Sequence, residues 1–165
     1  MAINNIGGFI ISRTIGLLAN ILKINNIYVL CGLPGSGKTT IAKKLAKRFN
    51  AKFYSFDEYK IKAKQIHEMT THQCFYKQIS AEVISGNNIV LDDLNTKVKS
   101  RQELLQSLND ISCKKILIVM TTPLEECLER NRYRAARLSD FIIYNLYKSY
   151  QPPELSEGWD EILYF

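Results

Sequence analysis

The sequence has no apolar run of the length that a membrane-spanning helix needs, which is about 18 residues. Its apolar fraction of 46% and charged fraction of 23% are those of a soluble globular protein. With 165 residues, the chain is long enough for one well-buried domain and too short for two of ordinary size. We therefore expect one soluble domain and no membrane partner.

The first 26 residues form an apolar extension ahead of this domain, which we expect over residues 27–165. The stretch from Ile6 to Ile24 is interrupted by Arg13 and follows no basic region, so it makes a poor signal peptide. As a short helix it would gather apolar residues on one face, namely Ile10, Leu17, Leu18 and Ile21. Such a face would pack on the domain, cover a sheet edge or mediate self-association. The sequence does not decide among these roles or fix the oligomeric state.

The sequence also lacks the residue spacings of metal sites and hydrolases. Its cysteines are Cys31, Cys74, Cys113 and Cys127. They show no CxxC or CxxH spacing, so neither a zinc site nor a disulfide framework is predicted, and we expect a cytoplasmic protein. His67 and His72 have no partners at metal spacing, and no Ser/His/Asp or Cys/His pattern is evident. We interpret both histidines as structural or surface residues.

The charge balance favours an anionic partner. The net charge is +6 and the isoelectric point is about 9.1. Nucleotides, nucleic acids and sugar phosphates all qualify. A lysine-rich solvated surface would give the same balance, so the charge does not choose among these partners.

The clearest motif is the segment 32–39, GLPGSGKT, which fits the phosphate-binding pattern GxxxxGK[ST]. It lies between an apolar run at 27–30 and a lysine-rich amphipathic segment at 41–49, the strand–loop–helix context that the motif requires. Glycines let backbone N–H groups turn toward a phosphate, Lys38 reaches the β and γ oxygens, and the Thr39 hydroxyl can ligate Mg²⁺. The sequence therefore predicts binding of ATP, or another nucleoside triphosphate, with Mg²⁺.

Apolar runs typical of buried strands alternate with helical patterns along the rest of the domain. The expected strands cover 27–30, 52–56, 89–91, 116–120 and 162–165. Expected helices cover 41–49, about 98–108, a segment from about 124, and 139–150, and helical segments span about 59–85. This alternation predicts an α/β fold, a three-layer sandwich around a parallel sheet of about five strands. Ligands of such sheets bind at the carboxyl ends of the strands.

Asp57 follows the second expected strand and is the first carboxylate after the loop helix. From there it can accept the proton of an acceptor hydroxyl while that oxygen attacks the γ-phosphorus. A helix cap is the alternative role. Lys60, three residues on, would lie beside Asp57 and steady a phosphate, or be an ordinary solvated lysine.

Asp92 and Asp93 end the third expected strand in the manner of a Walker-B segment, where one carboxylate holds Mg²⁺ directly or through water. We predict that Asp93 does so, together with Thr39, because Asp93 and Asn95 flank the point where the strand gives way to a loop.

Four arginines fall within eight positions, namely Arg130, Arg132, Arg134 and Arg137. Arg130 and Arg134 are four residues apart, so both guanidinium groups can extend from one helix face toward the phosphates. Arg132 and Arg137 fall elsewhere around the helix. A basic solvated face is the alternative, but guanidinium groups suit bidentate contact with phosphate oxygens. We expect an arginine-bearing lid.

The ordered combination of these motifs resembles the P-loop kinases related to polynucleotide 5′-hydroxyl kinase, including the bacteriophage kinase domain. The resemblance runs from about Ile27 to Phe165. It rests on the loop at 32–39, FYSFDEYK at 53–60, Asp93-Leu94-Asn95 with Arg101, RNRYR at 130–134, and the ending 153–162. Related P-loop kinases include zeta toxins and seryl-tRNA kinases.

The resemblance implies an adenylate-kinase-like fold and roles for individual residues. Asp57 is similar to the family's general base, and Arg134 to its lid arginine. The implied catalytic residues are Asp57, Lys38 and Arg134. The implied ATP-binding residues are Gly32, Leu33, Pro34, Gly35, Ser36, Gly37, Lys38, Thr39, Thr40, Arg130 and Arg134. The implied acceptor-binding residues are Asp57, Lys60, Asp93 and Arg101. Lys60 stands where the family often has arginine, which weakens its assignment because lysine lacks the bidentate fork.

The leading hypothesis is ATP-dependent phosphorylation of the 5′-hydroxyl of DNA or RNA, with nucleic-acid 5′ ends as partners. No DxDxT phosphatase motif follows, so a coupled 3′-phosphatase is not expected. The alternative keeps the fold and changes the acceptor to a small molecule, nucleoside, aminoacyl-tRNA or sugar nucleotide. A nucleotide-dependent switch without transfer is a third hypothesis. The sequence does not choose between DNA and RNA or fix the donor base.

Overall fold

The computed structural model describes residues 24–65 and 71–165. The predicted N-terminal helix and His67 lie outside the described residues.

Five parallel strands form one sheet. They are β1 (Asn25–Cys31), β2 (Lys52–Ser55), β3 (Ile89–Asp92), β4 (Cys113–Val119) and β5 (Glu161–Tyr164). Their order across the sheet is β2-β3-β1-β4-β5. The central strand β1 has an apolar, buried second half, as expected of a parallel strand covered on both faces. The predicted α/β fold with a five-stranded parallel sheet is confirmed.

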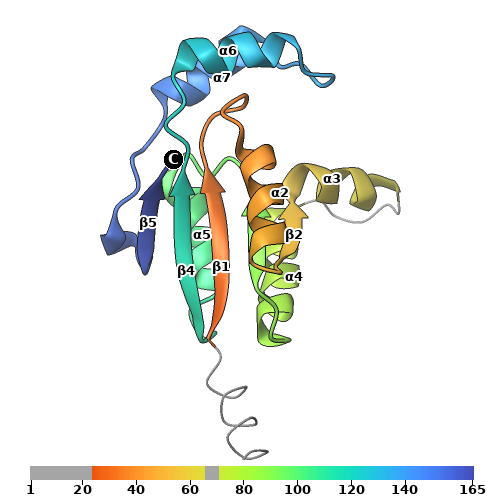
Figure 1. The fold of residues 1–165 in the computed structure, drawn as a ribbon, viewed down its shortest axis with the longest axis vertical. Coiled ribbons are helices and arrows are strands. Elements are labelled where there is room, and N and C mark those ends of the chain that lie inside the picture. The colour runs from red at the N-terminus through yellow and green to blue at the C-terminus, as the bar shows by residue number, and fades with distance from the viewer. Residues whose placement is uncertain (1–23, 66–70) are drawn as a thin grey trace, which may run out of the picture.

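The helices lie on both faces of the sheet and beyond its carboxyl end (Figure 1). They are α2 (Lys38–Arg48), α3 (Phe56–Gln65), α4 (His72–Ile84), α5 (Val98–Ser107), α6 (Leu124–Arg132) and α7 (Asp140–Lys148), with the 3₁₀ turn η1 (Leu155–Glu157). Helix α2 packs on one face of the sheet, and α4 and α5 pack on the other. Helices α6 and α7 arch over the top of the sheet in Figure 1 and form the lid.

Because β3 is pleated, its side chains point alternately toward the α2 layer and toward the layer of α4 and α5. Leu91 packs in the core with α4 and α5, whereas Val90 packs in the cluster that contains Ala42 of α2. Because successive side chains of a strand point to opposite faces, Asp92 shares the face of Val90. Its side chain is therefore directed to the α2 side of the sheet.

The described helices differ from the expected ones mainly at their ends. Strand β2 ends at Ser55 and helix α3 begins at Phe56, earlier than the expected helix start near residue 59, so Asp57 lies in the first helical turn. Helix α7 ends at Lys148, and its predicted cap Ser139 accepts a hydrogen bond from the N–H of Ile142. Within residues 24–65 and 71–165, no helix has the length and apolar character needed to cross a membrane.

Candidate active site

The loop at 32–39 wraps tightly because its glycines adopt backbone angles that other residues rarely reach. Gly37 has φ of 91° and precedes the first residue of α2. Gly32 has φ of 155°, and a Cβ atom there would lie 2.9 Å from both Met120 Cβ and Ser36 Oγ. A side chain at either position would distort the loop. The loop thus places backbone N–H groups at the N-terminus of α2, the geometry that binds phosphate.

Lys38 and Ser36 are buried within the loop. The Lys38 ammonium donates a hydrogen bond of 2.7 Å to the carbonyl of Leu33. Burial lowers the pKa of Lys38, an effect that nearby Asp92 opposes. The Ser36 hydroxyl is only 1% exposed and has no hydrogen-bond partner among the described residues. A buried polar group without a partner is costly, so this hydroxyl is suited to a ligand such as a phosphate oxygen.

The Thr39 hydroxyl and the Asp92 carboxylate lie together at the end of the loop. Thr39 Oγ1 donates a hydrogen bond of 2.6 Å to Asp92 Oδ2. Burial raises the pKa of Asp92, while the hydrogen bond from Thr39 and the charge of Lys38 lower it. Hydroxyl and carboxylate oxygens are the ligands that Mg²⁺ prefers, so this pair fits the ion that accompanies a nucleoside triphosphate.

Asp93 lies apart from this pair and belongs to the other face of the sheet. Its Oδ2 is 3.1 Å from Nε2 of His72 in the first turn of α4, and its Oδ1 accepts from the N–H of Leu94. The sequence predicted Asp93 as the metal ligand, but the structure brings Asp92 to Thr39 instead. The physical reason is the strand alternation that sends neighbouring side chains to opposite faces.

Asp57 and Lys60 form an exposed pair on the first turn of α3. Lys60 Nζ lies 2.7 Å from Asp57 Oδ1, and the same ammonium lies 4.9 Å from the ring centroid of Phe56. The Asp57 side chain is 78% exposed and therefore open to an acceptor. Ser55, two residues before Asp57, pairs in register with Asp92. Asp57, in the first turn of α3, and Asp92, the last residue of β3, thus lie at the same edge of the sheet.

The lid contacts the phosphate loop through its backbone and an arginine. A Cβ atom on Gly35 would collide with the carbonyl oxygen of Cys127 in α6, and it would lie 3.0 Å from the carbonyl carbon. Arg130 Nη1 would lie 3.6 Å from a Cβ atom on Gly37, and Arg130 also pairs with Glu126. The charge of Arg134 contributes to the lowered pKa of Lys38. The structure thus brings Arg130 to the loop, whereas α6 ends at Arg132 and Arg134 lies beyond the helix on which it was predicted.

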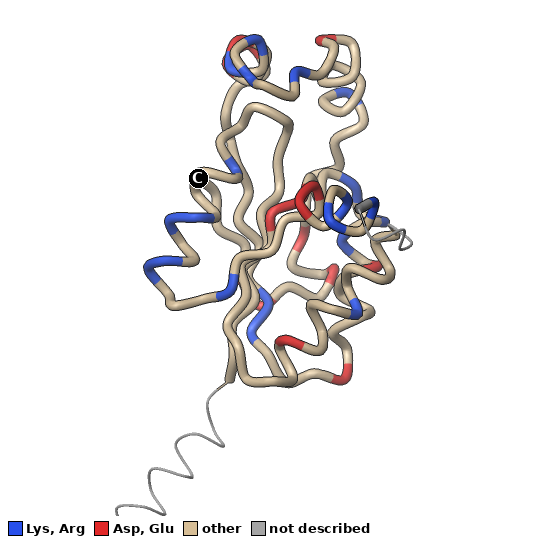
Figure 2. The backbone as a smooth tube through the Cα atoms, turned by 90° about the vertical axis from the view of Figure 1, so that its right-hand side faces the viewer, with Lys and Arg blue, Asp and Glu red and all other residues tan. Residues whose placement is uncertain are grey.

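The lid is not uniformly basic. Figure 2 shows blue and red segments together in the arch that α6 and α7 form above the sheet. Arg132 is exposed, and Arg137 lies 3.8 Å from Asp140. Within residues 24–65 and 71–165, neither of these arginines makes a hydrogen bond or ion pair with the phosphate loop.

Arg101 corrects a prediction, because its side chain is fully buried and cannot reach an acceptor. Its guanidinium makes two hydrogen bonds, of 2.7 and 2.6 Å, to the carboxylate of Glu157. It also donates to the carbonyls of Asn95, Gln151 and Pro152. These contacts join α5 to the segment that leaves the lid, so Arg101 has a structural role.

Aromatic side chains gather beside α3 and α4, on the acceptor side of the site. Phe56, Phe75 and Tyr76 are buried and form part of the core. Tyr54 donates its hydroxyl to Glu82 at 2.8 Å. Three of these rings are thus core residues and present no open stacking platform.

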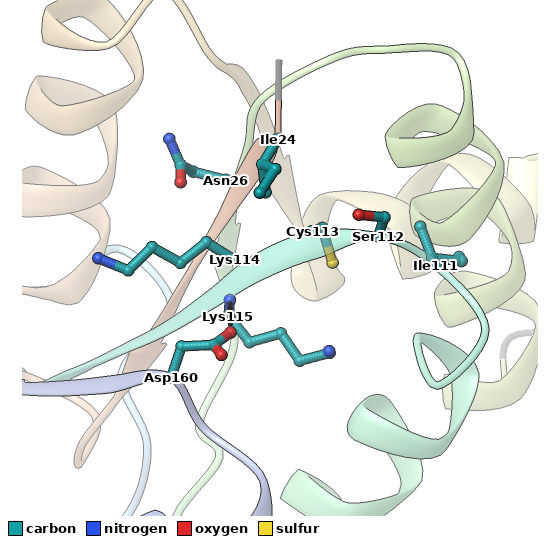
Figure 3. Close-up of a pocket in the computed structure, with 8 residues that line it drawn as sticks. All are labelled: Ile24, Asn26, Ile111, Ser112, Cys113, Lys114, Lys115 and Asp160. Atoms are coloured by element: carbon teal, nitrogen blue, oxygen red, sulfur yellow. Dashed lines mark hydrogen bonds between the residues drawn. The ribbon is translucent and has the colours of Figure 1, made fainter. Parts of the chain in front are cut away.

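A hollow outside this site lies at the opposite end of the sheet (Figure 3). It is lined by Ile24 and Asn26 at the start of β1, by residues 111–115 at the start of β4, and by Asp160. Since all strands are parallel, this hollow is at their amino ends, away from the phosphate loop.

Sequence reasoning did not reveal the contact of His72 with Asp93 or the isolation of the Ser36 hydroxyl from protein partners. The position of His72 depends on which helix covers which face of the sheet, so no local signal identified it. Ser36 lies within the motif and was predicted as one of the ATP-binding residues, but its isolation from protein partners is visible only in three dimensions.

Comparisons with known proteins agree with this geometry. The chain is 24% identical over 147 residues to an L-seryl-tRNA(Sec) kinase of Methanococcus maripaludis, a match that covers 81% of this chain and 56% of that protein. The chain thus spans little more than half the length of this curated relative.

Solved structures of low sequence identity share the fold. One is a sugar kinase from Janibacter, with a TM-score of 0.63, 17% identity and 85% of each chain covered. Another is a gluconokinase from Sinorhizobium meliloti, with a TM-score of 0.59, 15% identity, and 86% of this chain and 82% of that one covered. None of the three proteins is named as a polynucleotide kinase, so they support a kinase fold and not that specificity.

A family model described as an AAA domain matches residues 27–142. The match includes the phosphate loop, the aspartates that follow β2 and β3, and the lid arginines. It covers more than half of the chain, and this protein belongs to the AAA domain family.

Proposed function

We propose that this protein transfers the γ-phosphoryl group of ATP to an alcohol of a small molecule or an aminoacyl-tRNA. The observation that carries the proposal is the arrangement around the phosphate loop. Buried Lys38, the Thr39–Asp92 pair and the lid arginines surround one loop, and the exposed Asp57 lies at the same edge of the sheet.

The loop and the lid would hold the phosphates of ATP. Backbone N–H groups at the N-terminus of α2 bind phosphate oxygens, and the Ser36 hydroxyl gains a partner when they do. Lys38 would exchange its bond with the Leu33 carbonyl for the β- and γ-phosphates. Arg130 and Arg134 would stabilise charge that develops on the transferred group.

Thr39 and Asp92 would hold Mg²⁺, Thr39 through its hydroxyl and Asp92 through its carboxylate. When bound, the ion neutralises charge on the β- and γ-phosphate oxygens. We assign this role to Asp92 rather than Asp93, because only Asp92 contacts Thr39 among the described residues.

Asp57 would accept the proton of the acceptor hydroxyl as its oxygen attacks phosphorus. Its exposure leaves it open to solvent and substrate, and Lys60 at 2.7 Å supplies positive charge for the acceptor. A negatively charged acceptor, such as a sugar acid or a tRNA end, suits that lysine.

The names of the relatives support this acceptor class ahead of a polynucleotide 5′ end. The related proteins are a seryl-tRNA kinase and kinases of sugars, which match the alternative hypothesis better than the leading one. A 5′-hydroxyl polynucleotide stays as the second candidate, because the Asp57-Glu58-Tyr59-Lys60 segment and the net charge of +6 both suit a strand end.

Transfer of label from γ-labelled ATP in the presence of Mg²⁺ tests the proposal. The acceptors are gluconate, seryl-tRNA, and 5′-hydroxyl DNA and RNA oligonucleotides, with 5′-phosphorylated oligonucleotides as blanks. Asp57→Asn should reduce transfer by about 10²-fold or more and leave ATP affinity unchanged. Glu58→Gln, the neighbouring exposed carboxylate, is the matched control and should keep full activity.

Each result has a distinct meaning. Label on gluconate or seryl-tRNA supports the proposed acceptor class, and label on the oligonucleotides alone replaces it with the second candidate. ATP binding without transfer to any of these acceptors contradicts the kinase proposal and favours a nucleotide-dependent switch.

A further inference from the structure

We propose that His72 is a further acceptor-binding residue, held in place by Asp93, and that it accepts a hydrogen bond from a hydroxyl of the substrate. The inference rests on the proposed function, since it assigns a residue to the acceptor side of that site. It starts from a juxtaposition that the sequence does not reveal, namely the imidazole of His72 between Asp93 and the ring of Phe56.

His72 contacts residues next to both proposed functional aspartates, Asp57 and Asp92. Phe56 directly precedes Asp57, and its ring stacks on the imidazole with 3.7 Å between centroids and 24° between planes. Asp93 directly follows Asp92, and its carboxylate lies 3.1 Å from Nε2 of His72. His72 therefore lies between the residue that precedes the proposed base and the residue that follows the proposed Mg²⁺ ligand.

The carboxylate determines which ring nitrogen is available to a substrate. The Asp93 side chain is 11% exposed and also accepts from the N–H of Leu94, so its orientation is fixed from two sides. A carboxylate facing Nε2 favours the proton on that nitrogen, as in other carboxylate–histidine pairs. Nδ1 then carries a lone pair and acts as an acceptor.

That lone pair has no protein partner within residues 24–65 and 71–165. Only Nε2 of His72 makes a polar contact there, and the side chain is 42% exposed. The ring stacks on Phe56 and lies near the tilted ring of Tyr76, with 5.6 Å between the His72 and Tyr76 centroids. An imidazole that is oriented on one edge and open on the other is a preformed hydrogen-bond acceptor.

The site therefore favours an acceptor with at least two neighbouring donor groups. One hydroxyl would lose its proton to Asp57 during transfer, and a second hydroxyl or an ammonium group would donate to His72 Nδ1. Polyhydroxylated acids, a ribose and a seryl ester with a free amine all present such a pair. A simple monohydric alcohol does not.

Two substitutions separate the contact with the substrate from the contact with Asp93. In His72→Gln the longer amide retains a donor near the Nε2 position for Asp93 and lacks the Nδ1 acceptor. In His72→Asn the shorter amide retains an acceptor near Nδ1 and lacks the bond to Asp93. Gln73→Ala, at the adjacent exposed position of α4, is the matched control.

The acceptor identified among gluconate, seryl-tRNA and the oligonucleotides is used to measure KM and kcat, with KM for ATP measured in parallel. We expect His72→Gln to raise the acceptor KM by about tenfold, the loss of one hydrogen bond, with KM for ATP unchanged. His72→Asn should partly restore the acceptor KM, which a purely structural role would not produce. Equal changes in both KM values, or a fall in thermal stability alone, would overturn the inference.

A second readout needs no turnover. The chain has two histidines, so the ¹⁵N spectrum of the imidazoles contains two rings, and His67→Gln assigns them. We expect the His72 ring to carry its proton on Nε2, to lose that preference in Asp93→Asn, and to shift when the transferring acceptor is added. If the wild-type protein phosphorylates none of the probes, the proposed function fails. In that case, a ¹⁵N chemical shift of His72 that stays unchanged with every probe overturns this inference as well. A change in that chemical shift on addition of a probe supports it.

Discussion

Thr39 donates a hydrogen bond of 2.6 Å to Asp92 across 53 positions of the sequence. The contact joins the first turn of α2 to the last residue of β3, whose pleat directs Asp92 rather than Asp93 toward the phosphate loop.

The Mg²⁺ dependence of phosphoryl transfer should change when the Thr39–Asp92 contact is altered. Asp92→Asn removes the charge that would hold the ion, so we expect a higher Mg²⁺ requirement and a fall in kcat of about 10²-fold. Thr39→Ser keeps the hydroxyl and should remain close to wild type. Initial rates measured over a range of Mg²⁺ concentrations give the Mg²⁺ midpoint and kcat of each variant. Asp93→Asn should not change the Mg²⁺ midpoint, and a large shift in that variant would return the metal role to Asp93.

Lys60 should act on the acceptor and not on ATP. Lys60→Ala removes the ammonium beside Asp57 and should raise KM for an anionic acceptor by about tenfold, because one charge-assisted contact is lost. Lys60→Arg should keep most of the affinity. Lys62→Ala, an exposed lysine of the same helix, serves as the control. Steady-state kinetics with each substrate varied separately measure KM for the acceptor and for ATP. An equal rise in KM for ATP would contradict this role of Lys60.

Gly35 tests the contact between the loop and the lid. Gly35→Ala places a Cβ atom against the Cys127 carbonyl at a residue with φ of 86°, so both the clash and the backbone strain oppose it. Gly86→Ala has the same φ of 86° and open space around the Cβ atom. We expect Gly86→Ala to lower the thermal midpoint only. Gly35→Ala should lower it further and also weaken ATP binding, as measured by calorimetry. Equal behaviour of the two variants would show that strain alone matters.

The buried pair of Arg101 and Glu157 should contribute to stability in a pH-dependent way. Removing one partner of a buried pair leaves an uncompensated charge, so Arg101→Gln should cost about 3–5 kcal/mol of unfolding free energy. Lys114→Ala breaks the exposed pair with Glu161 and should have little effect. Urea denaturation at neutral pH compares the two variants.

The pH dependence of the same pair follows from Glu157. Burial favours a raised pKa, but hydrogen bonds from Arg101 and Trp159 outweigh burial and lower the pKa of Glu157 below its ordinary value of 4.5. A carboxyl with a lowered folded-state pKa contributes stability above its unfolded pKa and loses that contribution as the pH falls through the folded value. The stability difference between wild type and Glu157→Gln should therefore shrink at acid pH, below 4.5. A difference that is constant with pH would contradict this assignment.

The local features of this protein could be predicted from the sequence. The loop at 32–39, the alternation of strands and helices, and the cap at Ser139 depend on residues close together in the chain, and the structure contains all three. Residue spacing was sufficient for them because backbone conformation and helix capping are set within a few positions.

The tertiary structure alone decided the roles of Asp92, Arg101 and His72. The pleat of β3 directs Asp92 toward α2 and Asp93 toward α4, but this follows only once the layers of helices are known. Arg101 sits among apparently exposed residues in the sequence and is buried because Glu157, 56 positions later, comes back beside α5. Contacts between distant segments depend on the order of strands in the sheet and on the faces that the helices cover, and no spacing along the chain encodes these directly.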